Sequence, residues 1–200
     1  MALKTFVKVS GVNNLSDARY CAGMGVNQLG FNVENNHPNF TDPQSFKELS
    51  DWVSGVAFVA EIESLESKGQ LAQLIENYEV DAIQVSHAEL INEAAETGKE
   101  VVYFASSLAD AQKVAQDFQG LLSYILLEDE SAESGSLATM AQEIDLIIAS
   151  GFDADSVENV LELAPFKGIA LKGSDEIRPG FKDFDQMADI LEALDADEWA

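Results

Sequence analysis

Two stretches of this chain carry side chains that could handle protons. Glu128–Glu130 follow the apolar run Tyr124–Leu127, so carboxylic acids stand directly after a segment typical of a buried strand. Near the N-terminus, Lys8 and Ser10 lie two residues apart in a β-rich run, which places both side chains on one face of a strand. A lysine inside a folded domain needs a carboxylate partner, and Glu128 is a candidate. Lys8 then either forms a structural ion pair or tunes an acid.

The chain is strongly acidic, with 36 Asp and Glu against 11 Lys and Arg and a formal net charge of −25. Such a surface repels phosphate backbones and anionic lipids, so we expect neither nucleic acid nor a membrane as partner. Four of the 11 cations nevertheless fall in one C-terminal stretch, at Lys167, Lys172, Arg178 and Lys182. This grouping indicates either an anion-binding region or a chance cluster on a solvated face.

Several classes of protein are disfavoured by simple patterns. No apolar run reaches the length of about 18 residues that a membrane span needs, and the N-terminus lacks the features of an export signal. The single Cys21 cannot form an internal disulfide, which fits a cytoplasmic protein. No metal-ligand spacing, dinucleotide fingerprint or P-loop occurs, so we predict no metal and no cofactor. The two histidines, His37 and His87, fall in expected loops, and His87 is either a site residue or a helix start.

Short β-rich apolar runs alternate with helical patterns along the whole chain, as in proteins with parallel strands buried on both faces. The expected strands are Thr5–Val9, Gln28–Asn32, Val56–Glu61, Ala82–Ser86, Val101–Phe104, Tyr124–Leu127, Leu146–Ala149 and Ile169–Leu171. The expected helices are Leu15–Gly23, Pro43–Val53, Gly69–Tyr78, Ala88–Glu96, Leu108–Phe118, Leu137–Gln142, Asp155–Leu163 and Phe184–Leu194. Helix-start signals occur at Ser16 or Asp17, Asp42-Pro43, Asp155-Ser156 and Asp183.

This alternation predicts one α/β domain over residues 1–200, a compact (β/α)₈ TIM barrel, with an open doubly wound sheet as the alternative. In such barrels the ligand site lies at the carboxyl ends of the strands. The residues expected there are Ser10, Asn32 to Asn39, Glu61, Ser86-His87, Ser106-Ser107, Glu128 to Glu130, Ser150-Gly151 and Lys172 to Ser174.

The opening segment Lys4–Arg19 resembles the first strand, turn and helix of phosphoribosylanthranilate isomerases. Where that family has Lys-x-Cys-Gly-[IV]-[TR]-x-x-x-Asp-Ala, this chain has Lys8-Val-Ser-Gly-Val12 and then Asp17-Ala18. Other segments are similar to family segments in the same order: Gly25–Phe31, Asn36–Pro43, Val80–Ser86, Tyr124–Glu128, Ser150–Val160 and Pro179–Asp183. The chain is thus identified as a divergent member of the family that lacks the catalytic cysteine.

The resemblance implies a cofactor-free Amadori rearrangement in tryptophan biosynthesis. An acid at the end of the sixth strand would open the sugar of a phosphoribosyl amine, and a base at the end of the first strand would remove the C2 proton. The catalytic positions fall on Ser10 for the base and on Glu128, with Asp129 beside it, for the acid. Ser10 lacks the easily formed thiolate of a cysteine. The arginine that grips the anthranilate carboxylate falls on Asn39.

The resemblance also indicates a phosphate site of altered design. Gly151 and Gly173 could offer backbone N–H groups, Ser174 a hydroxyl, and Lys172 a cation that the family pattern lacks there. Gln84 and Lys8 complete the candidate substrate-binding residues. The readings that remain open are an isomerase of weak or altered activity, a lapsed barrel that binds a phosphorylated metabolite, and an isomerase of another phosphosugar, each as a monomer or homodimer.

Overall fold

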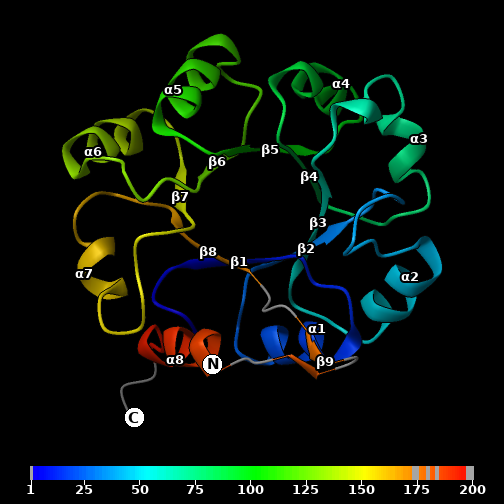
Figure 1. The fold of residues 1–200 in the computed structure, drawn as a ribbon, viewed down its shortest axis with the longest axis horizontal. Coiled ribbons are helices and arrows are strands. Elements are labelled where there is room, and N and C mark those ends of the chain that lie inside the picture. The colour runs from blue at the N-terminus through cyan, green and yellow to red at the C-terminus, as the bar shows by residue number, and fades with distance from the viewer. Residues whose placement is uncertain (1, 173–175, 179–180, 183–184, 197–200) are drawn as a thin grey trace.

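Eight parallel strands close into a barrel, and the helices surround it (Figure 1). The structure, a computed structural model, describes residues 2–172, 176–178, 181–182 and 185–196. Closure comes from β1 (Phe6–Ser10) pairing with β8 (Gly168–Lys172) in a continuous register from Phe6↔Gly168 to Ser10↔Lys172. The predicted (β/α)₈ barrel is therefore confirmed, and the open sheet is excluded.

The other barrel strands follow one another in chain order. They are β2 (Gln28–Asn32), β3 (Ala57–Ile62), β4 (Ala82–Val85), β5 (Glu100–Ala105), β6 (Tyr124–Leu127) and β7 (Leu146–Ile148). The helices are α1 (Leu15–Gly23), α2 (Pro43–Asp51), α3 (Leu71–Ile75), α4 (Ile91–Glu96), α5 (Leu108–Asp117), α6 (Ser134–Glu143), α7 (Val157–Leu161) and α8 (Asp185–Ala193). Short 3₁₀ turns, η1 (Leu65–Ser67) and η2 (Ala88–Leu90), precede α3 and α4.

Most expected elements agree with the structure to within a few residues, and the differences have local causes. The predicted start of α6 at Leu137 is too late, since the helix begins at Ser134. The helix predicted over Gly69–Tyr78 is shorter in the structure, where α3 spans Leu71–Ile75 and the turn η1 precedes it. A two-stranded hairpin, β9 (Glu176–Arg178) with β10 (Phe181–Lys182), follows β8 and was not expected.

Side-chain caps fix where several helices begin. The Asp42 side chain accepts hydrogen bonds from the backbone N–H groups of Gln44 and Ser45, and Pro43 opens α2, as predicted. For α1 the predicted bounds, Leu15–Gly23, are confirmed, but the start signal expected at Ser16 or Asp17 is wrong: the cap is Asn14, whose side chain accepts from the Asp17 N–H. The expected signal at Asp183 lies outside the described residues.

Two apolar layers hold the barrel together. The larger one lies between the strands and the helices and includes the wholly buried Leu29, Ile83 and Ile125. The smaller one fills the barrel's interior with alternate residues of the same strands, such as Val59, Val102 and Leu126. At its floor Tyr124 donates a 2.5 Å hydrogen bond to the Gln28 side-chain oxygen, which satisfies both buried groups. The strands therefore carry apolar residues on both faces, as parallel barrels require.

The seam between β1 and β8 demands a glycine. A Cβ atom at Gly168 would overlap the backbone carbonyl of Phe6, and backbone in a closed barrel cannot move aside as a flexible side chain can. Gly168 thus allows the first and last strands to approach closely enough to complete the ring.

We expect Gly168→Ala to lower the free energy of unfolding by at least about 2 kcal/mol, because overpacking against backbone forces the seam apart. Urea denaturation measures the change. Gly23→Ala is the matched control, since a Cβ atom there meets nothing within 4 Å, and it should alter stability by no more than about 1 kcal/mol, in the stabilising direction. Equal stability of Gly168→Ala and the parent protein would show that the seam tolerates a side chain.

Candidate active site

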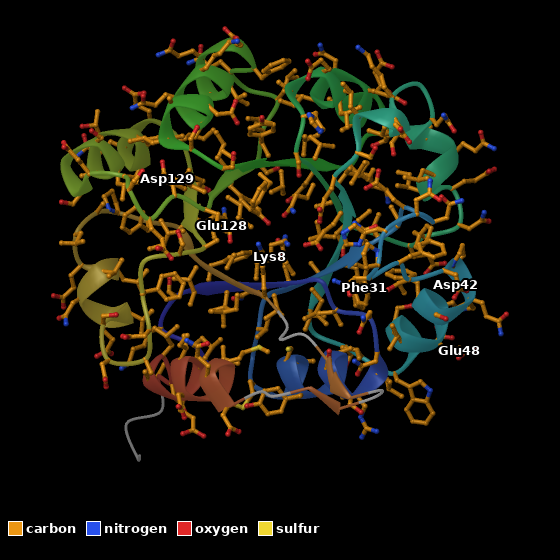
Figure 2. All side chains as sticks on the ribbon, viewed as in Figure 1. Lys8, Phe31, Asp42, Glu48, Glu128 and Asp129 are labelled. Atoms are coloured by element: carbon orange, nitrogen blue, oxygen red, sulfur yellow. The ribbon has the colours of Figure 1, made fainter. Side chains whose placement is uncertain are left out.

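A buried ion pair crosses the interior of the barrel. Lys8 on β1 and Glu61 on β3 have side chains that are 0% and 3% exposed, and Lys8 Nζ lies 2.5 Å from Glu61 Oε1. Gly30 on β2 lies between them, and a Cβ atom there would overlap the Glu61 carboxylate and approach Lys8 Nζ to 2.8 Å. The missing side chain at Gly30 therefore provides the space in which the two charges meet. Figure 2 shows Lys8 near the centre of the ring.

The expected pairing of Lys8 with Glu128 is wrong. Glu128 accepts hydrogen bonds of 2.8 and 3.0 Å from Lys172 Nζ instead. Lys8 lies one layer below the mouth, where Glu61 is within reach, whereas Glu128 lies just beyond the end of β6. Two separate lysine–carboxylate pairs therefore occupy the barrel, one buried and one at the rim.

Ser10 ends β1 directly above the buried pair. Its Oγ accepts a 2.5 Å hydrogen bond from Lys8 Nζ, so the hydroxyl hydrogen remains free to donate elsewhere. The next residue, Gly11, has a φ of +69° and donates its N–H to Glu61 Oε2 at 3.0 Å. Glu61 thus holds both the lysine beneath Ser10 and the turn that follows it.

A cavity of about 90 Å³ opens at the carboxyl ends of the strands, and we call it the mouth cavity. Its polar lining residues are Ser10, Glu61, Glu63, Gln84, Ser86 and Lys172. The register pairs Ser10 with Lys172, and Lys172 Nζ also lies 5.8 Å from the centre of the Phe104 ring. Ser10, at the end of β1, lines this cavity directly. Glu128, which follows β6, is linked to the cavity through its ion pair with Lys172.

Asp129 faces a different direction from Glu128. Its carboxylate accepts hydrogen bonds from the Ser131 hydroxyl and N–H and from the Leu108 N–H at the start of α5. The Ser131 hydroxyl, followed by the Leu108 N–H, lowers the pKa of Asp129 below its usual value. Figure 2 shows Asp129 farther from the barrel's centre than Glu128. The structure gives Asp129 the role of tying the loop after β6 to α5.

Two buried amides near the ion pair carry unpaired atoms. Gln84 on β4 is 5% exposed, and its Oε1 has no hydrogen-bond partner among the described residues. Asn32 on β2 is 1% exposed, and within the same described ranges its Nδ2 is likewise unpaired. Both are register partners of Glu61, one on each side. Unpaired buried polar atoms are costly, and those that face a cavity mark places where a ligand could supply the missing partner.

The remaining candidates are placed as follows. Asn39 lies beside the turn after β1, where its side chain accepts a 3.4 Å hydrogen bond from the Asn13 side chain. Gly151, with a φ of +81°, stands shortly after β7. Gly173 and Ser174 lie outside the described residues, so only the Lys172 and Gly151 portion of the expected phosphate site is described.

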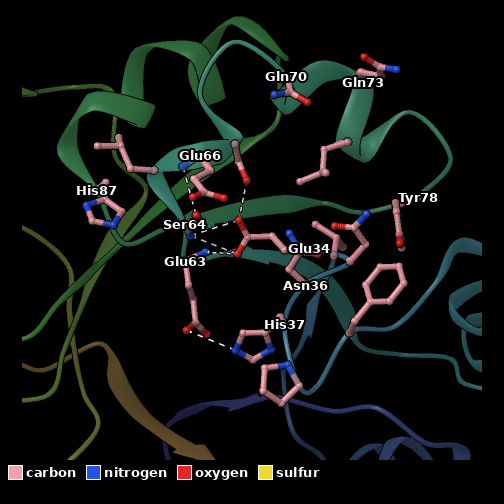
Figure 3. A pocket seen from close by; sticks show the side chains of 17 residues that line it. Glu34, Asn36, His37, Glu63, Ser64, Glu66, Gln70, Gln73, Tyr78 and His87 are labelled. Atoms are coloured by element: carbon pink, nitrogen blue, oxygen red, sulfur yellow. Dashed lines mark hydrogen bonds and ion pairs between the residues drawn. The ribbon is translucent and has the colours of Figure 1, made fainter.

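A second, larger cavity of about 910 Å³ lies over the loops that follow β2 and β3, and we call it the outer cavity (Figure 3). Its lining includes Glu34, His37, Phe40, Glu63, Tyr78 and His87. The Glu34 carboxylate accepts from the Glu63 and Ser64 N–H groups and from the Ser67 hydroxyl, which joins the two loops. His37 Nε2 lies 3.5 Å from a Glu63 carboxylate oxygen. Both histidines of the chain therefore line one cavity, an arrangement that their sequence positions did not reveal.

Glu61 is the site residue whose surroundings the sequence did not predict. Its place at a strand end was expected, but its contacts with Lys8 and Gly11 were not. The available signal was a charged residue at the end of an otherwise apolar strand, preceded by Gly30 on the neighbouring strand. Within the described residues, no cluster of His, Cys, Asp and Glu is arranged to bind a metal ion. In the same part of the chain, no helix has the length and hydropathy to cross a bilayer.

Comparison with known proteins gives one consistent result. A family described as N-(5'phosphoribosyl)anthranilate (PRA) isomerase matches residues 7–193. An N-(5'-phosphoribosyl)anthranilate isomerase from Synechococcus sp. (strain JA-2-3B'a(2-13)) is 23% identical over 219 residues, which cover 98% of this chain and 93% of the relative.

Solved structures of the same name share the fold. Phosphoribosyl anthranilate isomerase from Thermotoga maritima is 18% identical with a TM-score of 0.77, covering 95% of this chain and 98% of that one. A phosphoribosyl anthranilate isomerase in complex with reduced 1-(o-carboxyphenylamino)-1-deoxyribulose 5-phosphate is 19% identical with a TM-score of 0.76 and the same coverage. That structure holds a phosphorylated ligand.

We expect Lys8→Met to lower the free energy of unfolding by about 3–5 kcal/mol, because it leaves the buried Glu61 carboxylate without a counter-charge. The double variant Lys8→Met, Glu61→Leu removes both charges and should recover most of that loss. Lys4→Met serves as control, since Lys4 pairs with Glu158 at 2.6 Å but both side chains are about half exposed, and it should cost less than about 1 kcal/mol. Chemical denaturation of the three variants measures these differences. A loss in Lys8→Met no greater than in Lys4→Met would contradict the role given to the buried pair.

Proposed function

The chain belongs to the N-(5'-phosphoribosyl)anthranilate isomerase family, and we propose that it catalyses this family's Amadori rearrangement, in tryptophan biosynthesis, at a low rate. The substrate would be N-(5-phosphoribosyl)anthranilate, and the product the corresponding 1-amino-1-deoxyketose phosphate. The observation that carries the proposal is the mouth cavity, where Ser10 and Lys172, the ion partner of Glu128, are register partners on the adjacent strands β1 and β8.

Glu128 is the proposed acid, which would protonate the ring oxygen and open the sugar. It is preferred to Asp129, whose carboxylate is held by Ser131 and Leu108 and whose pKa is lowered by those hydrogen bonds. In the absence of substrate, Lys172 is the partner of Glu128. A substrate phosphate would compete for the same ammonium, and its arrival would release the Glu128 carboxyl group for proton transfer.

The proposed phosphate ligands are Lys172, Gly151, Gly173 and Ser174. Lys172 is 63% exposed, so it can turn from Glu128 to an incoming anion without leaving a buried charge behind. In a chain with a net charge of −25, a cation at the mouth also favours the approach of a phosphorylated substrate.

The low rate follows from two positions. Ser10 has no thiolate to offer, and Asn39 replaces a charged guanidinium by a neutral amide. The second change forgoes about 1.5–3 kcal/mol of charge-assisted hydrogen bonding to the substrate carboxylate. We further propose that the protein acts in the cytoplasm as a monomer or homodimer, without a cofactor and without nucleic acid or membrane partners.

Purified protein should convert N-(5-phosphoribosyl)anthranilate slowly, and its gene should restore growth to a tryptophan auxotroph that lacks the isomerase. Chromatography of the reaction mixture measures conversion. The positive control is the N-(5'-phosphoribosyl)anthranilate isomerase from Synechococcus under the same conditions. No conversion above the uncatalysed rate, together with no growth, would rule out the proposed function.

Asn39→Arg should restore the missing grip on the carboxylate and lower KM about tenfold to a hundredfold, with kcat little changed. Steady-state kinetics measures both constants. The matched control is Asn36→Arg, which adds the same charge to the same loop at an exposed position. If the two variants lower KM equally, the effect is general attraction, and the assignment of Asn39 to the carboxylate is wrong.

A further inference from the structure

We infer that Glu61 is the base that removes the C2 proton, the role that the family pattern places on residue 10. This inference rests on the proposed function and names the group that performs its second half. It follows from three features of the mouth cavity: the direction of the Ser10 hydrogen bond, the state and position of the Glu61 carboxylate, and the unpaired oxygen of Gln84.

Ser10 is arranged as a donor and not as a base. Its Oγ already accepts a 2.5 Å hydrogen bond from the Lys8 ammonium, whose charge is paired with the Glu61 carboxylate. An ammonium cannot take a proton from Ser10, so no group beneath the hydroxyl can activate it. The Ser10 hydrogen points instead to a substrate oxygen, and the positive charge beneath it strengthens that donation.

Glu61 has the properties that Ser10 lacks. As the partner of Lys8 it is a carboxylate, and it lines the same mouth cavity as Ser10. Among the described residues its Oε2 accepts from the Gly11 N–H alone, at 3.0 Å, whereas a carboxylate oxygen has two acceptor positions. The second position on Oε2 can receive a proton. Because Gly11 and Lys8 hold the group from two sides, it is fixed before the substrate arrives, which favours proton transfer.

Gln84 marks where the substrate would lie next to Glu61. It is the register partner of Glu61 on β4, it lines the mouth cavity, and it is 5% exposed. Its Oε1 has no hydrogen-bond donor among the described residues. A sugar hydroxyl is a donor of the right kind, and binding there would bring the adjacent carbon of the sugar against Glu61.

The proton steps balance with two carboxyl groups. When the substrate phosphate has displaced Glu128 from Lys172 and Glu128 has taken up a proton from water, it gives this proton to the ring oxygen, the C1–O bond breaks, and C1 and nitrogen form an iminium. Glu61 takes the C2 proton, the C2–H electrons form a C1=C2 double bond, and the iminium electrons return to nitrogen. Glu61 then returns its proton to C1, while the C2 hydroxyl loses its proton to Glu128 and becomes the ketone. Both carboxyl groups end as they were in the substrate complex, with Glu128 protonated and Glu61 ionised.

Glu61→Gln should lower kcat at least about 100-fold, the usual size of a general-base contribution, with KM changed less than about threefold. Ser10→Ala should lower kcat less than about tenfold, because the hydroxyl only donates to the substrate. Glu61→Asp keeps the charge and should recover at least about a tenth of the lost activity. Glu100→Gln is the matched control, since Glu100 is an exposed carboxylate at the amino end of β5, away from the mouth.

Glu61→Gln could lose activity because it unfolds, and the double variant Lys8→Met, Glu61→Leu is the control for this outcome. It carries no buried charge, so it should fold, and it should be as inactive as Glu61→Gln. Circular dichroism and urea denaturation establish that the variants fold. Substrate deuterated at C2 should show a larger kinetic isotope effect on kcat with the Glu61→Asp variant than with the parent protein. A folded double variant that keeps more than about a tenth of the parent's activity would overturn the inference, because no proton-transfer role could then belong to Glu61.

The outcomes separate the two proposals. A parent protein that converts the substrate, with Ser10→Ala inactive and Glu61→Gln active, leaves the function standing and overturns the inference. A parent protein without activity overturns both. Conversion that is lost in both Glu61→Gln and the folded double variant, but kept in Ser10→Ala and Glu100→Gln, supports both.

Discussion

The structure depends on one unusual arrangement, a full ion pair inside a closed barrel. Lys8 and Glu61 are almost without solvent contact, so each charge is tolerable only because the other is present. The pair joins β1 to β3 across β2, and it can do so because Gly30 has no side chain. Closer to the mouth, Lys8 donates a hydrogen bond to the Ser10 hydroxyl, and Glu61 accepts one from the Gly11 N–H in the turn after β1. The positions of Ser10 and Gly11 at the base of the mouth therefore depend on a single buried contact, and the apolar layers around it supply the rigidity.

The fold was readable from the sequence because its signals are local and repeated. Gln28–Asn32 and Tyr124–Leu127 were predicted at their observed bounds, since strands buried on both faces form short apolar runs between polar turns. The start of α2 was likewise clear from Asp42-Pro43. The bounds of α1 were also predicted as observed, but its capping residue was not, because Asn14 stands among several residues able to cap a helix and spacing does not choose between them.

The site was less readable because its contacts join residues far apart in the chain. The alternation of side chains along β1 predicts that Lys8 points into the barrel, but it does not predict how far below the mouth Lys8 lies. That depth decides whether Glu61 or Glu128 is within reach of the Lys8 ammonium. Depth is set by the stagger of neighbouring strands, which is a property of the assembled barrel. The separate directions of Glu128 and Asp129 depend in the same way on the start of α5 and on Ser131. Tertiary register, which no single segment encodes, determined these partners.

The outer cavity is built mainly from the loops after β2 and β3, which Glu34 joins through Glu63, Ser64 and Ser67, and α3 and the loop after β4 complete its lining. The hydrogen bonds that Glu34 accepts thus cross-link these two loops into one unit, or cassette, above β2 and β3. Tyr78 adds a further link by donating a 2.8 Å hydrogen bond to the Thr41 carbonyl. Such a cassette can diversify by insertion or exchange without disturbing the strands below. The barrel can in this way change one sector of its rim while the buried Lys8–Glu61 pair and the strands that carry it stay unaltered.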